Sequence, residues 1–260
     1  MFEKKTKDAK RVLLYLSLKY KGDWDMIFSN VGKEVVDEEY LNQELSKMRF
    51  KYVTILDKEY PEQLKGIYKP PLVLYYYGDI NLLKKERILG VAGSRNASSY
   101  ALEACSKIIG EIEDEELVVL SGLARGVDTV ALTSAKNNNL KMIGILGTGI
   151  DYCYPSENYP LYKKMKEDGL LISEYPYKEI VSKKNFTFRN RLVAAFSSVL
   201  FIPEVKDRSG TLVTIKHALT MNKTVMVVPT SIFDENYNNH ILKCGAKVIT
   251  TGKDLNYENF

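Results

Sequence analysis

The distribution of apolar residues becomes regular from residue 88 onward. Short apolar runs alternate there with amphipathic runs of about ten residues, which is typical of strands buried on both faces and followed by helices. We predict strands at 88–92, 117–120, 141–146, 170–173, 198–202, 224–228 and 247–250, and helices at 97–112, 127–136, 157–168, 188–197, 210–221 and 236–243. This alternation implies right-handed βαβ units and a mostly parallel sheet with helices on both faces. The expected fold is α/β, a doubly wound sheet of the extended Rossmann-like type.

Residues 1–50 have a different pattern. Three apolar runs with helical spacing predict three short helices before the sheet begins. Two further strands are expected at 52–56 and 72–76, and the prolines between them forbid a continuous helix. We therefore expect a small N-terminal helical domain at 1–50 and a Rossmann-like domain at 51–260.

The composition, with 45% hydrophobic and 27% charged residues, is that of an ordinary soluble protein. No apolar run is long enough to cross a membrane, and the charged N-terminus lacks a signal-peptide cleavage site, so we expect a cytoplasmic protein without membrane contact. The residues that could bind a transition metal are few and lack metal-ligand spacing: Cys105, Cys153, Cys244, His217 and His240. The two histidines also give little basis for a Ser-His-Asp triad. The sequence therefore predicts no metal, no cofactor and no catalytic residue.

Ligands of a doubly wound sheet bind at the carboxyl ends of its strands, so the turns after the strands are the expected site. Four of these turns, at 93–95, 121–128, 147–151 and 208–211, are rich in glycine and serine. Three of them carry an arginine, although the chain has 29 lysines and only 8 arginines. The candidate residues in these turns are Gly93, Ser94, Arg95, Ser121, Gly122, Arg125, Gly126, Arg208, Ser209 and Gly210.

Arginine presents a rigid fork of donors that suits phosphate, and turns at one sheet edge form a row of anion sites. Such a row suits a polyanion with regularly spaced phosphates. The alternative for any single turn is structural, since glycine and serine are common in such loops. A dinucleotide site is less well supported, because the first turn lacks the G-x-G-x-x-G spacing, and no P-loop motif occurs.

A fifth feature is the segment 185–191, in which two aromatic residues come immediately before the expected start of a helix at Arg189-Asn190-Arg191. Proteins that bind single-stranded nucleic acid with little sequence preference use aromatic rings that stack on bases, together with nearby cations that contact the backbone. The alternative is that Phe186 and Phe188 seal the edge of the sheet. We expect Phe186 to be the ring exposed to a ligand.

The segments GSR, SGLARGVD, GTGIDYCYPSEN, SEYP, FTFRNR and SGTLVT, in this order and spacing, resemble the DNA processing protein A family, also called DprA or Smf. The resemblance implies a homodimer that binds single-stranded DNA, protects incoming DNA during natural transformation and loads a RecA-type recombinase, without being an enzyme. It also implies phosphate contacts by Arg95, Ser121, Gly122, Arg125, Ser209 and Gly210, and base stacking by Phe186. Arg208 stands at the position of a basic residue found in some members.

The chain departs from the family pattern at Leu132, where members often have histidine, and at Thr230, where glycine is usual. It stops at Phe260, so we expect it to lack the C-terminal winged-helix domain of many members. Two alternatives stay open. One is a nucleotide hydrolase of the phosphoribohydrolase type, with Glu174, Glu204 or Asp128 as acid or base, although its P-G-G-x-G-T pattern is missing. The other is a scaffold that binds only protein.

Overall fold

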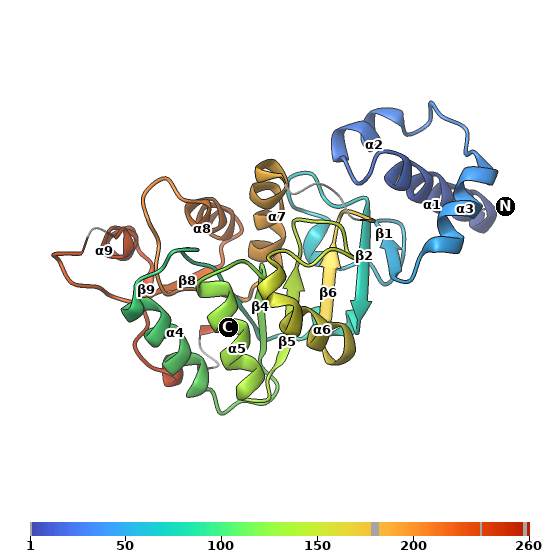
Figure 1. The fold of residues 1–260 in the computed structure, drawn as a ribbon. Helices are drawn as coiled ribbons and strands as arrows, with labels where there is room; N and C mark the ends of the chain where they lie inside the picture. Colours follow the sequence, from blue (N-terminus) through green and yellow to red (C-terminus); the bar gives the residue numbers. More distant parts are fainter. Residues whose placement is uncertain (1, 178–181, 235, 257–258) are drawn as a thin grey trace.

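The computed structural model describes residues 2–177, 182–234, 236–256 and 259–260. Within these ranges the chain forms a nine-stranded sheet in the order β1-β2-β6-β5-β4-β3-β7-β8-β9, with helices on both faces (Figure 1). The strands are β1 (Lys51–Thr54), β2 (Val73–Gly78), β3 (Ile88–Val91), β4 (Val118–Ser121), β5 (Lys141–Ile145), β6 (Leu170–Ser173), β7 (Val199–Ile202), β8 (Thr224–Val227) and β9 (Lys247–Val248). The helices are α1 (Phe2–Lys19), α2 (Trp24–Asn30), α3 (Glu38–Lys47), α4 (Ser99–Gly110), α5 (Val127–Asn137), α6 (Tyr159–Asp168), α7 (Lys183–Phe196), α8 (Gly210–Thr220) and α9 (Asn238–Lys243).

The sheet is parallel from β6 to β9, whereas β1 and β2 add an antiparallel edge. The predicted α/β fold with a mostly parallel sheet is confirmed. From β3 the chain builds outward through β4, β5 and β6, and then returns to place β7 on the other side of β3. The order of strands therefore reverses between β3 and β7. In open α/β sheets this reversal marks the crevice in which ligands bind.

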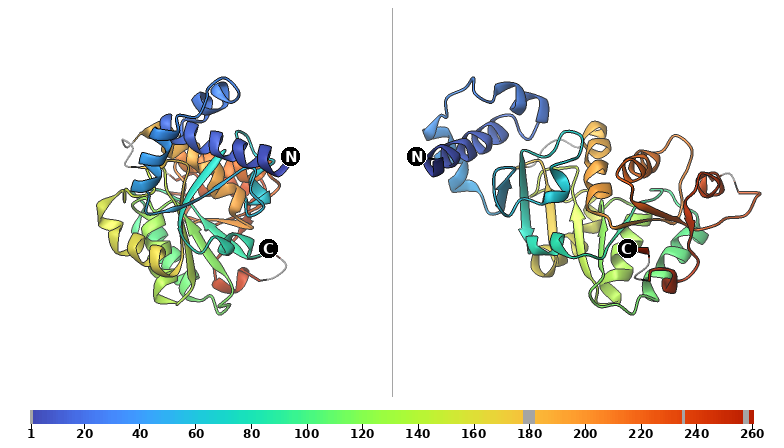
Figure 2. Two further views of the ribbon diagram at one scale, coloured as in Figure 1. Left: turned by 90° about the vertical axis from the view of Figure 1, so that its right-hand side faces the viewer. Right: turned by 180° about the vertical axis from the view of Figure 1, so that it is seen from behind.

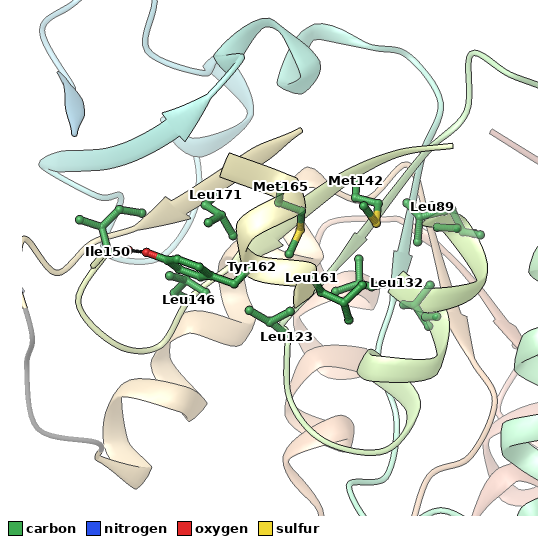
Figure 3. Packing of buried hydrophobic residues seen from close by; sticks show 14 of the residues in the cluster. Leu89, Leu123, Leu132, Met142, Leu146, Ile150, Leu161, Tyr162, Met165 and Leu171 are labelled. Atoms are coloured by element: carbon green, nitrogen blue, oxygen red, sulfur yellow. Dashed lines mark hydrogen bonds between the residues drawn. The ribbon is translucent and has the colours of Figure 1, made fainter. Parts of the chain in front are cut away.

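Two apolar layers hold the helices to the sheet, because successive residues of a strand point to opposite faces. Leu89 packs in one layer and Ile88 in the other, and both are buried. Figure 3 shows part of the first layer, where α5 and α6 cover β4, β5 and β6. The Tyr162 hydroxyl there donates a hydrogen bond of 2.7 Å to the Ile150 carbonyl (Figure 3), so even the polar tip of this side chain is satisfied.

The N-terminal helices α1–α3 gather at the β1 end of the molecule (Figure 2). The Tyr75 hydroxyl donates to Ser17 Oγ over 2.8 Å, and the Trp24 indole donates to the Pro70 carbonyl over 2.7 Å. The helix α1 is longer than the short helix expected from the pattern. The division into domains at 1–50 and 51–260 stays a prediction. Within the described ranges, the structure contains no helix with the length and apolar character needed to cross a bilayer.

Most predicted elements match within a few residues, with three differences. The helix α7 begins at Lys183 instead of 188, because nothing between Ser182 and Phe188 breaks a helix. The expected helix at 157–168 is a short 3-10 turn (Ser156–Asn158) followed by α6, with Pro160 in the first turn of the helix. The strand β9 has two residues instead of four.

Candidate functional site

A cavity of about 400 Å³ opens at the carboxyl edge of the sheet, in the crevice between β3 and β7. Its walls are the turn after β3, the first turns of α7 and the start of α8. The predicted residues that line it are Gly93, Ser94, Arg95, Gly122, Phe186, Arg189, Asn190, Ser209 and Gly210. The tertiary structure thus brings together residues from three turns and from one helix that the sequence places far apart.

Arg95 and Phe186 form the exposed part of this cavity. The guanidinium carbon of Arg95 lies 5.2 Å from the centroid of the Phe186 ring, within the range of a cation–π contact. Among the described residues no salt bridge joins Arg95 to a carboxylate, although its positive charge acts on the buried Asp128 and opposes the rise of the pKa of that carboxyl. Phe186 is half-buried and leans on Tyr154, with 5.8 Å between the ring centroids. A Cβ on Gly147 would lie 2.7 Å from Phe186 Cδ1, so the third turn serves to make room for this ring.

Arg189 forms the floor and is only 4% exposed. Its guanidinium donates to the Gly122 carbonyl over 2.7 Å and to the Ile145 carbonyl. Burial lowers the pKa of Arg189 to about 10, and the negative charge of Asp128 opposes this shift. Burial raises the pKa of Asp128, which the charge of Arg189 in turn counteracts. The two groups therefore stabilise each other's charged forms although both side chains are buried.

Two helices present their N-termini to the cavity without a side-chain cap. Neither Ser182 of α7 nor Ser209 of α8 accepts a capping hydrogen bond. The buried Ser209 hydroxyl has no partner among the described residues. No acidic residue occupies the first turn of α7, which begins instead with Lys183 and Lys184. The N-terminus of a helix carries partial positive charge from its free N–H groups, and the two lysines add to that charge at α7. The N-termini of α7 and α8 therefore favour a bound anion.

The first and second turns touch each other through Gly126. This residue has φ of +75° and is the N-cap of α5, and a Cβ on it would lie 2.6 Å from the Arg95 carbonyl oxygen. The Val127 N–H donates to the Ser94 carbonyl over 3.2 Å. Glycine is required here because the backbone is left-handed and because the neighbouring turn approaches so closely. Gly126 thus holds the turn that carries Arg95.

Other predicted residues lie outside the cavity lining. The Ser121 hydroxyl is buried and donates to the Val91 carbonyl over 2.9 Å. Arg125 is exposed and pairs with Glu157 over 2.5 Å, while the exposed Arg208 lies 3.6 Å from Asp207. Arg191 is 1% exposed and makes a two-pronged ion pair with Glu174, with both N–O distances 2.6 Å. Ser121 and Arg191 are thus engaged inside the protein, whereas Arg125 and Arg208 lie at the surface in exposed ion pairs.

Two lysines line the cavity that sequence reasoning did not select. Lys183 begins α7, and Lys206 follows β7 and donates to the Asn96 carbonyl over 2.8 Å. Both were overlooked because lysine is the common cation of this chain, whereas the scarce arginines drew attention. The signal that points to Lys206 is its position, four residues after the end of β7 at the sheet edge where ligands bind.

Comparison with known proteins places this geometry in a family. The family model described as DNA recombination-mediator protein A matches residues 51–259. This chain belongs to that family. It is 37% identical to the DNA processing protein DprA of Streptococcus pneumoniae over 222 residues, which are 85% of this chain and 77% of the relative. It is 34% identical to the DprA of Bacillus subtilis over 205 residues, covering 78% of this chain and 69% of the relative.

Two solved structures of the family share this fold over most of the chain. DNA processing protein A from Streptococcus pneumoniae matches with a TM-score of 0.80 and 34% identity, covering 97% of this chain and 94% of that one. The protein from Helicobacter pylori, whose structure was analysed for its single-stranded DNA binding mode, matches with a TM-score of 0.71 and 28% identity, over 79% and 94% of the two chains. These similarities favour the recombination-mediator hypothesis over the phosphoribohydrolase hypothesis.

Proposed function

We propose that this protein binds single-stranded DNA in the cavity at the β3–β7 crevice. The observation that carries the proposal is the placement of Arg95 against Phe186, beside the uncapped N-termini of α7 and α8. A cation and an aromatic ring at one position offer contacts to a phosphate and to a base of the same strand. The single-stranded DNA binding mode of the Helicobacter pylori relative supports the proposal.

The phosphate backbone runs along the turns in this proposal. Arg95, Lys183 and Lys206 contact phosphates, together with N–H groups at the start of α8, and Phe186 stacks on a base. Gly93, Ser94, Gly122, Asn190 and Gly210 provide the polar and glycine surface between them. Arg189 acts from beneath as a buried positive charge. Ser121, Arg125, Gly126, Arg191 and Arg208 contribute by holding turns or by adding charge at the rim.

The bound strand is then passed to a RecA-type recombinase in the cytoplasm, and the protein acts as a binding protein without catalysing a reaction. Membership in a recombination-mediator family supports this role. The cysteines Cys105, Cys153 and Cys244 are all free thiols, which is compatible with a reducing compartment. A stimulation of recombinase loading onto single-stranded DNA by the wild-type protein, lost in an Arg95 variant, would test this part.

The protein forms a homodimer through its C-terminal segment in this proposal. Ile232 and Phe233 are 86% and 89% exposed, and β9 leaves the edge of the sheet open with Val248 half-exposed. Exposed apolar residues and an open strand edge are both typical of surfaces that associate. Ile241, in contrast, is 8% exposed and belongs to the core. Sedimentation of the wild type as a dimer and of Phe233→Asp as a monomer would support this surface.

Fluorescence anisotropy with a labelled oligo-dT of about twenty nucleotides tests the proposed function. Binding should weaken steeply as salt rises, because neutralised phosphates release counterions. A double-stranded oligonucleotide of the same length serves as competitor and should displace the strand poorly. Failure to bind the single strand at low salt would overturn the proposal. For the alternative, the protein is incubated with adenosine monophosphate and the mixture is separated by chromatography. Release of free adenine would indicate phosphoribohydrolase activity instead.

A further inference from the structure

A second cavity, of about 380 Å³, lies on the opposite side of α7 from the first. It is lined by the start of α2, by the loop before β2 and by α7. Figure 1 shows α7 standing between α8 and the N-terminal helices, and the view from behind in Figure 2 shows the same order. The first cavity therefore faces α8, and the second faces the N-terminal helices.

The first turns of α7 form a wall of both cavities. Lys183 and Phe186 line the first, whereas Lys184 and Phe188 line the second. An α-helix is about 10–12 Å across with its side chains, so a polymer leaving one cavity over this helix end reaches the other within a few residues of its own length. One extended polymer could therefore occupy both cavities in succession.

Aromatic rings and an ammonium group dominate the second cavity. Tyr68 is 67% exposed, and Trp24 lies nearby with its indole fixed to the Pro70 carbonyl. The Lys69 ammonium lies 5.2 Å from the centroid of the Trp24 ring and 5.5 Å from that of Tyr68. Asp25 holds this ammonium in place over 2.6 Å. An exposed ring beside a fixed cation is suited to stacking on a base.

The charges of this cavity nearly cancel. Its cations are Lys21, Lys69 and Lys184, and its anions are Asp23 and Asp25. Asp23 accepts the Met26 N–H as the cap of α2 and lies 3.8 Å from the Lys184 ammonium. The first cavity, in contrast, holds Arg95, Arg189, Lys183 and Lys206 against Asp128. Any strand in the second cavity is therefore held by stacking more than by phosphate attraction.

The buried pair of Arg191 and Glu174 supports the loop that carries these groups. Arg191 donates to the Tyr68 carbonyl over 3.2 Å and to the Lys69 carbonyl over 2.8 Å. Lys69 has φ of +49°, a left-handed conformation that is uncommon outside glycine. A strained residue persists only when its surroundings hold it. Arg191 therefore holds the loop that carries Tyr68 and Lys69, although Arg191 itself does not line the second cavity.

We propose that this cavity is a second subsite for single-stranded DNA, in which Tyr68 stacks on a base of the strand that has crossed α7 from the first cavity. This inference rests on the proposed function. It adds a stacking station formed between the N-terminal helices and the sheet, which ties those helices to DNA binding.

Trp24 is the only tryptophan of the chain, so its emission reports directly on the second cavity. Labelled oligo-dT strands of about four and about sixteen nucleotides, spanning the usual range of single-strand site sizes, are titrated while anisotropy and Trp24 emission are recorded. The longer strand should change Trp24 emission, and the shorter one should not. Tyr68→Ala should weaken the longer strand about fivefold or more, with the shorter strand and the salt slope unchanged.

Tyr52→Ala is the matched control, since Tyr52 is 40% exposed on β1 and lines neither cavity. Saturated anisotropy with the longer strand and no change in Trp24 emission would overturn the second subsite while leaving the proposed function intact. Equal affinities for Tyr68→Ala and Tyr52→Ala would do the same. A wild-type protein that binds neither strand would overturn the proposed function, and the second subsite with it.

Discussion

The guanidinium carbon of Arg95 lies 5.2 Å from the centroid of the Phe186 ring. One residue comes from the turn after β3 and the other from the first turn of α7, so the contact joins two segments that are distant in the chain. A carboxylate in this place would neutralise the charge of Arg95. The aromatic ring instead holds the guanidinium over the cavity and leaves its charge available to a ligand. The pair thus offers a charge and a stacking face together.

Arg95→Ala should weaken binding of an oligo-dT of about twenty nucleotides tenfold or more and lower the slope of log affinity against log salt by about one, because one phosphate contact is lost. Anisotropy titrations at several salt concentrations measure both. Arg49→Ala is the control, since Arg49 is exposed and lies away from the cavity. A loss of less than about twofold would remove Arg95 from the interface.

Phe186→Ala should also weaken binding, by roughly 1–3 kcal/mol, but without changing the salt slope, because a stacking ring contacts no phosphate. The same titrations separate this result from that of Arg95→Ala. Phe186→Tyr should retain most of the affinity, since the face of the ring remains. If alanine and tyrosine at this position bind equally well, stacking by Phe186 is excluded.

Gly126→Ala should lower the free energy of unfolding by about 1–3 kcal/mol, because alanine is strained at a left-handed φ. Its Cβ would also press on the Arg95 carbonyl, so DNA affinity should fall as well. Urea unfolding and anisotropy measure the two effects. Gly110→Ala is the control, because a Cβ there meets nothing within 4 Å at the end of α4. Equal stabilities of the two variants would contradict this account.

The buried carboxyl of Asp128 should make stability depend on pH. Burial raises its folded-state pKa above the ordinary value of 3.8, so the folded protein binds more protons at intermediate pH. This contribution is fully present below the unfolded-state pKa, and the free energy of unfolding decreases as the pH rises through the folded-state pKa. Urea titrations of the wild type and Asp128→Asn from about pH 4 to pH 7 should therefore diverge. If the free energies of unfolding of the two proteins change in parallel with pH, the pKa of Asp128 does not differ between the folded and unfolded states.

Arg191→Ala and Glu174→Ala should each lower the free energy of unfolding by roughly 3–5 kcal/mol, since each leaves an unpaired buried charge. The double variant should lose little more than either single one, because both charges are then gone. Urea unfolding of the three variants completes the cycle. Additive losses would mean that the two side chains stabilise the fold independently.

The alternation of apolar and amphipathic runs was enough to predict the order of strands and helices, because buried strands and covering helices leave local periodic patterns. It also located the turns at the carboxyl edge. The boundary of α7 was missed, and with it the fact that Phe186 lies inside a helix. A helix start depends on weak capping preferences, and the strongly basic first turn of α7 hides it.

Arg189 and Arg191 separate what the sequence determined from what only the tertiary structure decided. The sequence alone determined the fold class and marked both arginines as candidates, because they share one motif in a chain where arginine is scarce. Two residues apart on a helix, their side chains point in nearly opposite directions. Arg189 reaches the Gly122 carbonyl beneath the cavity, whereas Arg191 reaches Glu174 on the other side. Which role each one takes depends on the oxygens that distant segments bring near, and that is decided only when the chain has folded.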